Sequence, residues 1–239
     1  GSIITRDVTA RLSEVLSAHL SPSQEIKSPD RLIGRERSIQ AIRRALLSPG
    51  RHIFIFGDRG VGKTSLAVTA GQLCATENKN FIYIPCSQDT TFYDVIWAIG
   101  LCILEIDPVR RKVGGFSFGV SAAALGGFNF SRSTGDEKID RPSSFSECLA
   151  VLRFLRSQLS GQIIIAIDEI DRISSASEKA LFAELLKNVG SVVEEVRFIY
   201  CGIGADVDDI IGSHLSVGRM FEPIKVEKLS HDSLWKIIQ

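Results

Sequence analysis

The sequence predicts an α/β fold of three layers with a mostly parallel, five-stranded sheet. Short apolar runs such as HIFIF (52–56) and IIIAI (163–167) alternate with helix-length stretches from residue 52 onward, a pattern typical of a parallel sheet. The runs carry few polar residues, as expected when helices cover both faces of the sheet. The chain has 239 residues, of which 44% are hydrophobic, so it can fill one large core.

Two helices are predicted before the first strand. Val8, Leu12 and Val15 recur at helical spacing and predict a helix over residues 5–20, and a similar apolar face predicts a second helix over Glu36–Leu47. The alternating part then has predicted strands at 52–56, 81–85, 163–167, 196–201 and 224–229, and predicted helices at 63–74, 91–105, 144–159, 177–189 and 206–211.

The loop GDRGVGKT, residues 57–64, follows the first predicted strand and opens the next helix. It fits the phosphate-binding pattern GxxxxGK[ST], in which glycines let backbone N–H groups turn toward phosphate oxygens at a helix N-terminus. We expect Lys63 to reach the β- and γ-phosphates and the Thr64 hydroxyl to bind Mg²⁺. The predicted nucleotide contacts of this segment are Gly57, Arg59, Gly60, Val61, Gly62, Lys63, Thr64 and Ser65.

A second segment, IIIAIDEID, ends a buried strand with two adjacent carboxylates. Asp168 should emerge at the carboxyl edge of the sheet, beside the phosphate loop. We expect Asp168 to hold Mg²⁺ through water, and Glu169 to orient and deprotonate the attacking water. The alternative is that both are ordinary loop carboxylates that cap the next helix. Asp171 fits a structural role better than a catalytic one.

Charge and composition weigh against several classes of protein. The formal net charge is +0, which argues against constitutive, non-specific binding of nucleic acid. The five cysteines form no close pair and no metal-ligand spacing, which favours reduced thiols in a cytoplasmic protein. The longest charge-poor run, residues 113–130, is broken by glycines and polar residues, so we expect no membrane-spanning helix. A guanine-reading NKxD stretch is absent, which favours ATP over GTP.

The segments LIGRERSIQAI, GDRGVGKT, IDEID and GRMF occur in the order seen in AAA+ ATPases. Over roughly residues 30–230 the chain resembles this P-loop family, most of all the branch of origin-recognition initiators, transposition regulators and STAND-type signalling ATPases. The resemblance implies ATP and Mg²⁺ as cofactors. The AAA+ core would then span 31–229, after an N-terminal helix and linker at 1–30. Because His231-Asp232-Ser233 is typical of a helix start, we expect residues 230–239 to begin a truncated helical lid in part of a longer protein.

The resemblance assigns two further groups of residues. In this family the turn around Gly-Arg-Glu lies against the adenine, which implies base contacts by Leu32, Ile33 and Gly34; an apolar turn suits a purine, and a plain helix N-terminus is the alternative. An arginine before the fifth strand often reaches the γ-phosphate of a neighbouring subunit. Arg219 occupies that position, so it would act in trans; the alternative is that it pairs with Glu222.

The chain departs from the family pattern at the end of the fourth predicted strand. The family usually carries Asn, Thr or Ser there, whereas this sequence has Cys201. A thiol is a weak hydrogen-bonding group, so we expect slow hydrolysis or help from another residue.

The segment between the two motifs is long enough to hold an insert. Phe116 and Phe118 alternate with small or polar residues, as do Phe128 and Phe130, which predicts a β-hairpin over about residues 112–135. Basic residues gather at its base. The hairpin would contact DNA, contact another protein during assembly, or pack on its own domain or stay mobile; the net charge favours the alternatives to DNA.

Several functions fit these observations. The first is an ATP-binding and ATP-hydrolysing module that couples nucleotide state to assembly of a homo-oligomer through the nucleotide interface, and signals to a fused or separate effector, as in bacterial defence. The second is a DNA-directed initiator or transposition regulator, for which the net charge gives no support. The third is a nucleotide-braced scaffold with little turnover.

Overall fold

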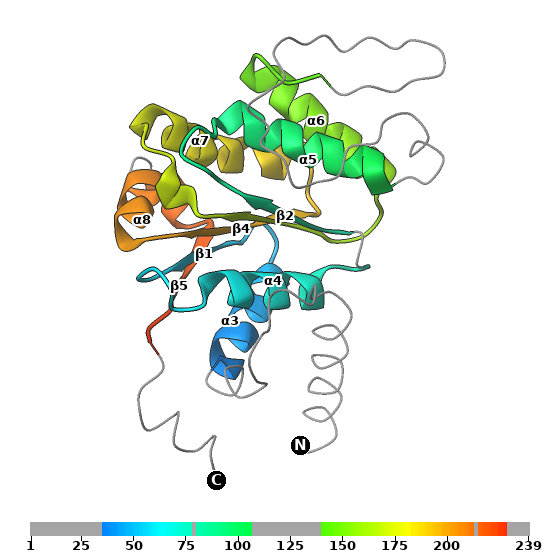
Figure 1. Ribbon diagram of the computed structural model, residues 1–239. Coiled ribbons are helices and arrows are strands. Elements are labelled where there is room, and N and C mark those ends of the chain that lie inside the picture. Colours follow the sequence, from blue (N-terminus) through cyan, green and yellow to red (C-terminus); the bar gives the residue numbers. More distant parts are fainter. Residues whose placement is uncertain (1–34, 78–79, 107–139, 213–214, 229–239) are drawn as a thin grey trace.

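The computed structural model describes residues 35–77, 80–106, 140–212 and 215–228 (Figure 1). Four predictions lie outside these ranges: the N-terminal helix, the adenine turn at 32–34, the hairpin insert and the start of the lid.

A five-stranded sheet forms the middle layer, in the order β2-β3-β4-β1-β5. All neighbouring strands are parallel, which confirms the predicted sheet. The order places β1 and β3, whose carboxyl ends carry the two motifs, on either side of β4. The strands are β1 (His52–Phe56), β2 (Phe81–Pro85), β3 (Ile163–Asp168), β4 (Val196–Gly202) and β5 (Phe221–Lys225).

Helices cover both faces of the sheet (Figure 1). One face carries α3 (Glu36–Leu46) and α4 (Lys63–Cys74), and the other carries α5 (Phe92–Ile106), α6 (Phe145–Gln158) and α7 (Ala176–Val192). Two short helices, α8 (Gly204–Ile211) and α9 (Leu215–Gly218), connect β4 to β5. The predicted three-layer α/β class is confirmed. Among the described helices, none is long and apolar enough to cross a membrane.

The two faces have separate hydrophobic cores, which explains the unbroken apolar runs. Successive side chains of a strand point to opposite faces. In β1, Ile53 and Ile55 therefore pack with α3 and α4, whereas Phe54 packs in the core beneath α5, α6 and α7. In that second core Phe54 meets Tyr200 and Phe221 edge to face, with ring centroids 6.1 and 5.6 Å apart. The three central strands, β1, β3 and β4, are buried almost throughout, so their carboxyl ends hold the following loops in fixed positions.

The fifth strand begins at Phe221, earlier than the predicted start at residue 224. The prediction was wrong because Glu222 and Pro223 read as the end of a loop. Pro223 pairs with Phe54 of β1, and β5 lies at the edge of the sheet. A residue without an N–H group is tolerated on an edge strand, because that strand has a neighbour on one side only.

Candidate functional site

The loop of residues 57–62 joins β1 to α4 and lies against the end of β5. Gly57 has φ 154° and Gly62 has φ 94°, angles that residues with side chains rarely adopt. A Cβ atom at Gly57 would lie 2.2 Å from the Val226 carbonyl oxygen, so only glycine fits there. The curl of this loop delivers the chain into the amino end of α4, whose first N–H groups have no partner within the helix.

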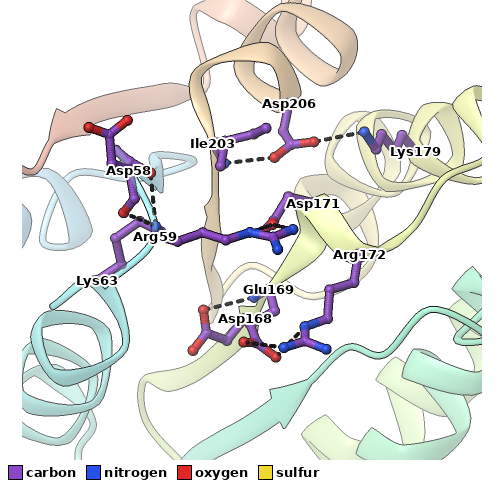
Figure 2. A network of polar contacts seen from close by, with 11 residues as sticks. Asp58, Arg59, Lys63, Asp168, Glu169, Asp171, Arg172, Lys179, Ile203 and Asp206 are labelled. Carbon is purple, nitrogen blue, oxygen red and sulfur yellow. Dashed lines mark hydrogen bonds and ion pairs between the residues drawn. The ribbon is translucent and has the colours of Figure 1, made fainter. Parts of the chain in front are cut away.

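Lys63 is the first residue of α4, and its ammonium lies inside the curve of the loop. Its Nζ donates hydrogen bonds to the carbonyl oxygens of Gly57 at 2.8 Å and Asp58 at 2.7 Å, as Figure 2 shows for part of this network. The residue is only 9% exposed. A positive charge and a helix N-terminus therefore meet at one place, which is an arrangement suited to an anion.

Asp168 ends β3 and brings the two sequence motifs together. Its Oδ2 accepts hydrogen bonds from Thr64 Oγ1 at 2.6 Å and from the Tyr83 hydroxyl at 2.8 Å, and its Oδ1 accepts from the Glu169 N–H at 2.8 Å. The residue is 1% exposed. A buried carboxylate needs such donors, and here one of them is the predicted metal-binding hydroxyl.

Glu169 has the left-handed backbone conformation, with φ 56° and ψ 39°. It is the non-glycine residue with positive φ in the described part of the chain, and such outliers concentrate at functional sites. Its carboxylate is held by Arg172, with Oε2 2.9 Å from Nε and Oε1 3.1 Å from Nη2 (Figure 2). Both side chains are nearly half exposed.

Arg59 links the phosphate-binding loop to the segment after β3. Its guanidinium donates to Asp171 Oδ2, with Nη2 at 2.9 Å and Nε at 3.2 Å, as drawn in Figure 2. The Asp171 side chain is 7% exposed and that of Arg59 is 75% exposed. The Asp171 carboxylate is therefore paired with Arg59.

Cys201 lies in β4 beside Asp168, because Tyr200 pairs with Ile167 one residue earlier. Its side chain is fully buried. Burial raises the pKa of the Cys201 thiol well above its usual value, and the Asp168 carboxylate raises it further. The residue is therefore an uncharged, weak hydrogen-bonding group at this edge. All five cysteines of the chain are free.

Arg35 connects the amino end of α3 to the phosphate-binding loop. Its Nη2 donates to the carbonyl oxygen of Val61, and to that of Glu227 at 3.3 Å. Burial lowers the pKa of Arg35 from its usual value. Arg35 is thus fixed beside the loop, whereas the predicted adenine contacts, Leu32, Ile33 and Gly34, lie outside the described residues.

Arg219 lies at the opposite edge of the sheet from the residues above. It precedes β5, whose first residue, Phe221, pairs with His52 at the amino end of β1. Glu222, the alternative partner considered for Arg219, forms an ion pair with Arg51 at 2.6 Å instead. Arg51 also donates to the Arg219 carbonyl oxygen at 2.7 Å. The Arg219 residue is exposed.

A buried ion pair supports the loop that follows β4. Lys179 of α7 lies 2.7 Å from Asp206 Oδ1 and 3.1 Å from Asp209 Oδ2. The other oxygen of Asp206 accepts from the Ile203 N–H at 2.7 Å (Figure 2). Burial opposes the charge on Lys179, but the two aspartates outweigh it and raise the pKa of Lys179. The pair ties α7 to the start of α8.

Sequence reasoning missed Tyr83, Arg172 and Asp206 as neighbours of the site. The hydroxyl of Tyr83 in the otherwise apolar run FIYIP was one available signal. Burial, followed by Asp168, raises the pKa of Tyr83, so its hydroxyl stays protonated and can donate. Arg172 and Asp206 left no signal, because charged residues after strands are common.

The oxygen donors at this edge fit a magnesium ion that is held mainly by a nucleotide. Thr64 supplies a hydroxyl and Asp168 a carboxylate, 2.6 Å apart. Mg²⁺ in nucleotide sites takes one or two protein oxygens, with water and phosphate completing its shell. In the described part of the chain no group of three or more His, Cys, Asp or Glu side chains could hold a metal ion by itself.

Several solved structures share this fold. Cdc6p from Pyrobaculum aerophilum matches with a TM-score of 0.58 at 19% identity, over 91% of this chain and 51% of that one. The ORC1 protein of Aeropyrum pernix, solved in complex with DNA, matches with 0.52 at 18%, over 85% and 48%. A Walker-type ATPase of Pyrococcus abyssi matches with 0.53 at 19%, over 83% and 55%. The chain thus spans about half the length of these proteins.

The similarity to solved structures, at such low sequence identity, shows the fold and not the family. A comparison of the sequence with family models assigns the family. No curated protein matches the sequence. The model of the AAA ATPase domain matches residues 31–199, more than two thirds of the chain, and this range contains the phosphate-binding loop and both carboxylates. The match confirms the resemblance that the motifs predicted. The chain belongs to the AAA ATPase domain family.

Proposed function

We propose that residues 31–229 form a module that binds ATP with Mg²⁺, hydrolyses it, and uses its nucleotide state to control assembly with further copies. Lys63 and the amides of the loop would bind the phosphates, and Thr64 and Asp168 would hold the metal. Glu169 would orient and deprotonate the attacking water. A fused or separate effector would respond to the assembled state.

One contact carries the nucleotide part of this proposal: the 2.6 Å hydrogen bond from Thr64 to Asp168. It joins the first residues of α4 to the last residue of β3, which are 104 positions apart in the chain. A hydroxyl that donates to a carboxylate still has a lone pair for a metal. The same two groups can therefore hold Mg²⁺ beside the phosphates that Lys63 faces.

Hydrolysis would require Glu169 to exchange its contact with Arg172 for the attacking water. The two side chains are 45% and 48% exposed, and ion pairs at such sites contribute about 0–1 kcal/mol. Breaking the ion pair between Glu169 and Arg172 therefore requires little free energy. Slow turnover, if observed, would have its source elsewhere, and Cys201 is the group that replaces the polar residue usual in this family.

The position of Arg219 supports the assembly part of the proposal. The phosphate-binding loop follows Phe56 at the carboxyl end of β1, whereas Arg219 lies beyond the amino end. A strand of this length spans about 13 Å at about 3.3 Å per residue. Arg219 is thus poorly placed for its own nucleotide. Because its guanidinium is exposed, it can reach the γ-phosphate of a second copy.

The variant Glu169→Gln tests whether this domain hydrolyses ATP or is only stabilised by bound ATP. We expect the intact protein to bind ATP, to release phosphate at least about 10²-fold more slowly, and to contain more oligomer with ATP present. Phosphate release and size-exclusion chromatography measure both. Glu194→Gln, at an exposed residue outside the site, is the control. An unchanged ATP lifetime in Glu169→Gln would favour the scaffold and contradict the proposal.

A further inference from the structure

Tyr83 lies within β2, outside both nucleotide-binding motifs, yet its hydroxyl donates to Asp168 Oδ2 at 2.8 Å. In the parallel pairing of β2 with β3, Tyr83 is opposite Ala166. Because side chains alternate along a strand, Tyr83, Ala166 and Asp168 all lie on one face of the sheet. Ala166 and Tyr83 belong to the core beneath α4.

The contact fixes a carboxylate that other donors reach from different directions. Thr64 donates to the same oxygen at 2.6 Å, and the Glu169 N–H donates to the other oxygen at 2.8 Å. Thr64 and Glu169 belong to the two motifs, and Tyr83 belongs to neither. Asp168 is 1% exposed, so bulk water cannot replace a donor that is lost. These three donors come from three different elements and restrict the rotation of the carboxylate.

We propose that Tyr83 is a positioning residue for the magnesium ion of bound nucleotide: it holds Asp168 in the orientation from which Asp168 and Thr64 bind the metal. This inference rests on the proposed function, because it requires Mg²⁺ at this edge. Partners that orient a ligand carboxylate from behind commonly change metal affinity 10- to 100-fold. Tyr83 acts through Asp168, and its own role is to restrict the rotation of that side chain.

The variant Tyr83→Phe tests the inference because it removes the hydroxyl and keeps the ring. In the intact protein, ATP binding is measured by calorimetry across a titration of MgCl₂ and separately in EDTA. We expect the half-maximal increase in ATP affinity to require at least about 10-fold more Mg²⁺ than in the wild type. The affinity in EDTA should be unchanged. Tyr93→Phe is the matched control, because Tyr93 lies on α5 and packs against Phe92; it should titrate like the wild type.

A double-mutant cycle with Asp168→Ala separates positioning from packing. If Tyr83 acts through Asp168, adding Tyr83→Phe to Asp168→Ala should cause no further loss of Mg²⁺ response. A Tyr83→Phe variant that titrates like the wild type, or that weakens equally in EDTA, would overturn this inference and leave the proposed function intact. If the wild type itself showed no Mg²⁺-dependent ATP binding, the proposed function would fail, and this inference with it.

Discussion

His52 shows how much a single buried group can contribute to the pH dependence of this domain. It is 2% exposed at the start of β1, and its Nδ1 accepts a hydrogen bond from the Phe198 N–H at 3.0 Å. A nitrogen that accepts cannot carry a proton. Burial, with a smaller contribution from Arg197, lowers the pKa of His52 from 6.5 to about 3. The folded domain therefore holds this ring neutral in a range where an unfolded chain would protonate it.

We predict that the free energy of unfolding decreases as the pH falls from 6.5 toward 3. In this window the unfolded state binds a proton that the folded state does not, so His52 reduces stability by up to about 1.4 kcal/mol per pH unit. Above pH 6.5 its contribution is constant. Urea denaturation at several pH values measures the slope. His52→Gln keeps an acceptor for Phe198 and should show a shallower slope; identical slopes would contradict the prediction.

At the scale of single elements, two glycines predict opposite responses to the same substitution. Gly57 has φ 154°, and a Cβ there would meet the Val226 carbonyl at 2.2 Å. Gly190 lies within α7, where a Cβ would meet nothing within 4 Å. We predict that Gly57→Ala destabilises the domain by at least about 1–3 kcal/mol. Gly190→Ala should stabilise it by about 0.5–1 kcal/mol, because alanine is the better helix former.

Thermal and urea denaturation of both variants provide the measurement, with Gly190→Ala as the control for adding one methyl group. Equal effects of the two substitutions would show that the loop is not pressed against β5. Gly57→Ala should also weaken ATP binding, since its loop carries the amides that would bind the phosphates in the proposed site.

The same elements show what the sequence could and could not predict. The predicted bounds of β1, β2 and α4 agree with the structure. These boundaries could be predicted because they depend on local residues, such as the ends of apolar runs and the glycines of the loop. The start of β5 at Phe221 was missed, since a proline is acceptable only once the strand is known to lie at an edge. Asp168 was predicted to lie beside the loop from strand ends alone. Its contact with Tyr83 depends on the register of β2 against β3, which no local pattern encodes.

At the scale of the whole molecule, the two ends of the sheet carry different parts of the proposed site. We predict that Arg219→Ala lowers ATP hydrolysis by about 10³-fold and leaves ATP binding largely intact, whereas Lys63→Ala abolishes binding. Mixing the two inactive variants should restore activity. About a quarter of random contacts would then pair an intact loop with an intact arginine.

Phosphate release from the mixture measures complementation. The controls are each variant alone, and a mixture of wild type with a Lys63→Ala/Arg219→Ala double variant. Activity that stays at the level of the separate variants would show that Arg219 serves no neighbouring copy. Activity retained by Arg219→Ala alone would show that this guanidinium is dispensable.

The separation of Arg219 from the loop by the length of β1 also constrains the symmetry of any such assembly. A contact that joins the amino edge of one copy to the carboxyl edge of the next uses two different surfaces of each copy, so it is head-to-tail unless it is returned across a two-fold axis. Copies joined head-to-tail have a direction, and they either close into a ring or end in two unlike termini. In an open row, the copy at one terminus always has a loop that receives no arginine, so such a row would carry one fewer complete site than it has copies.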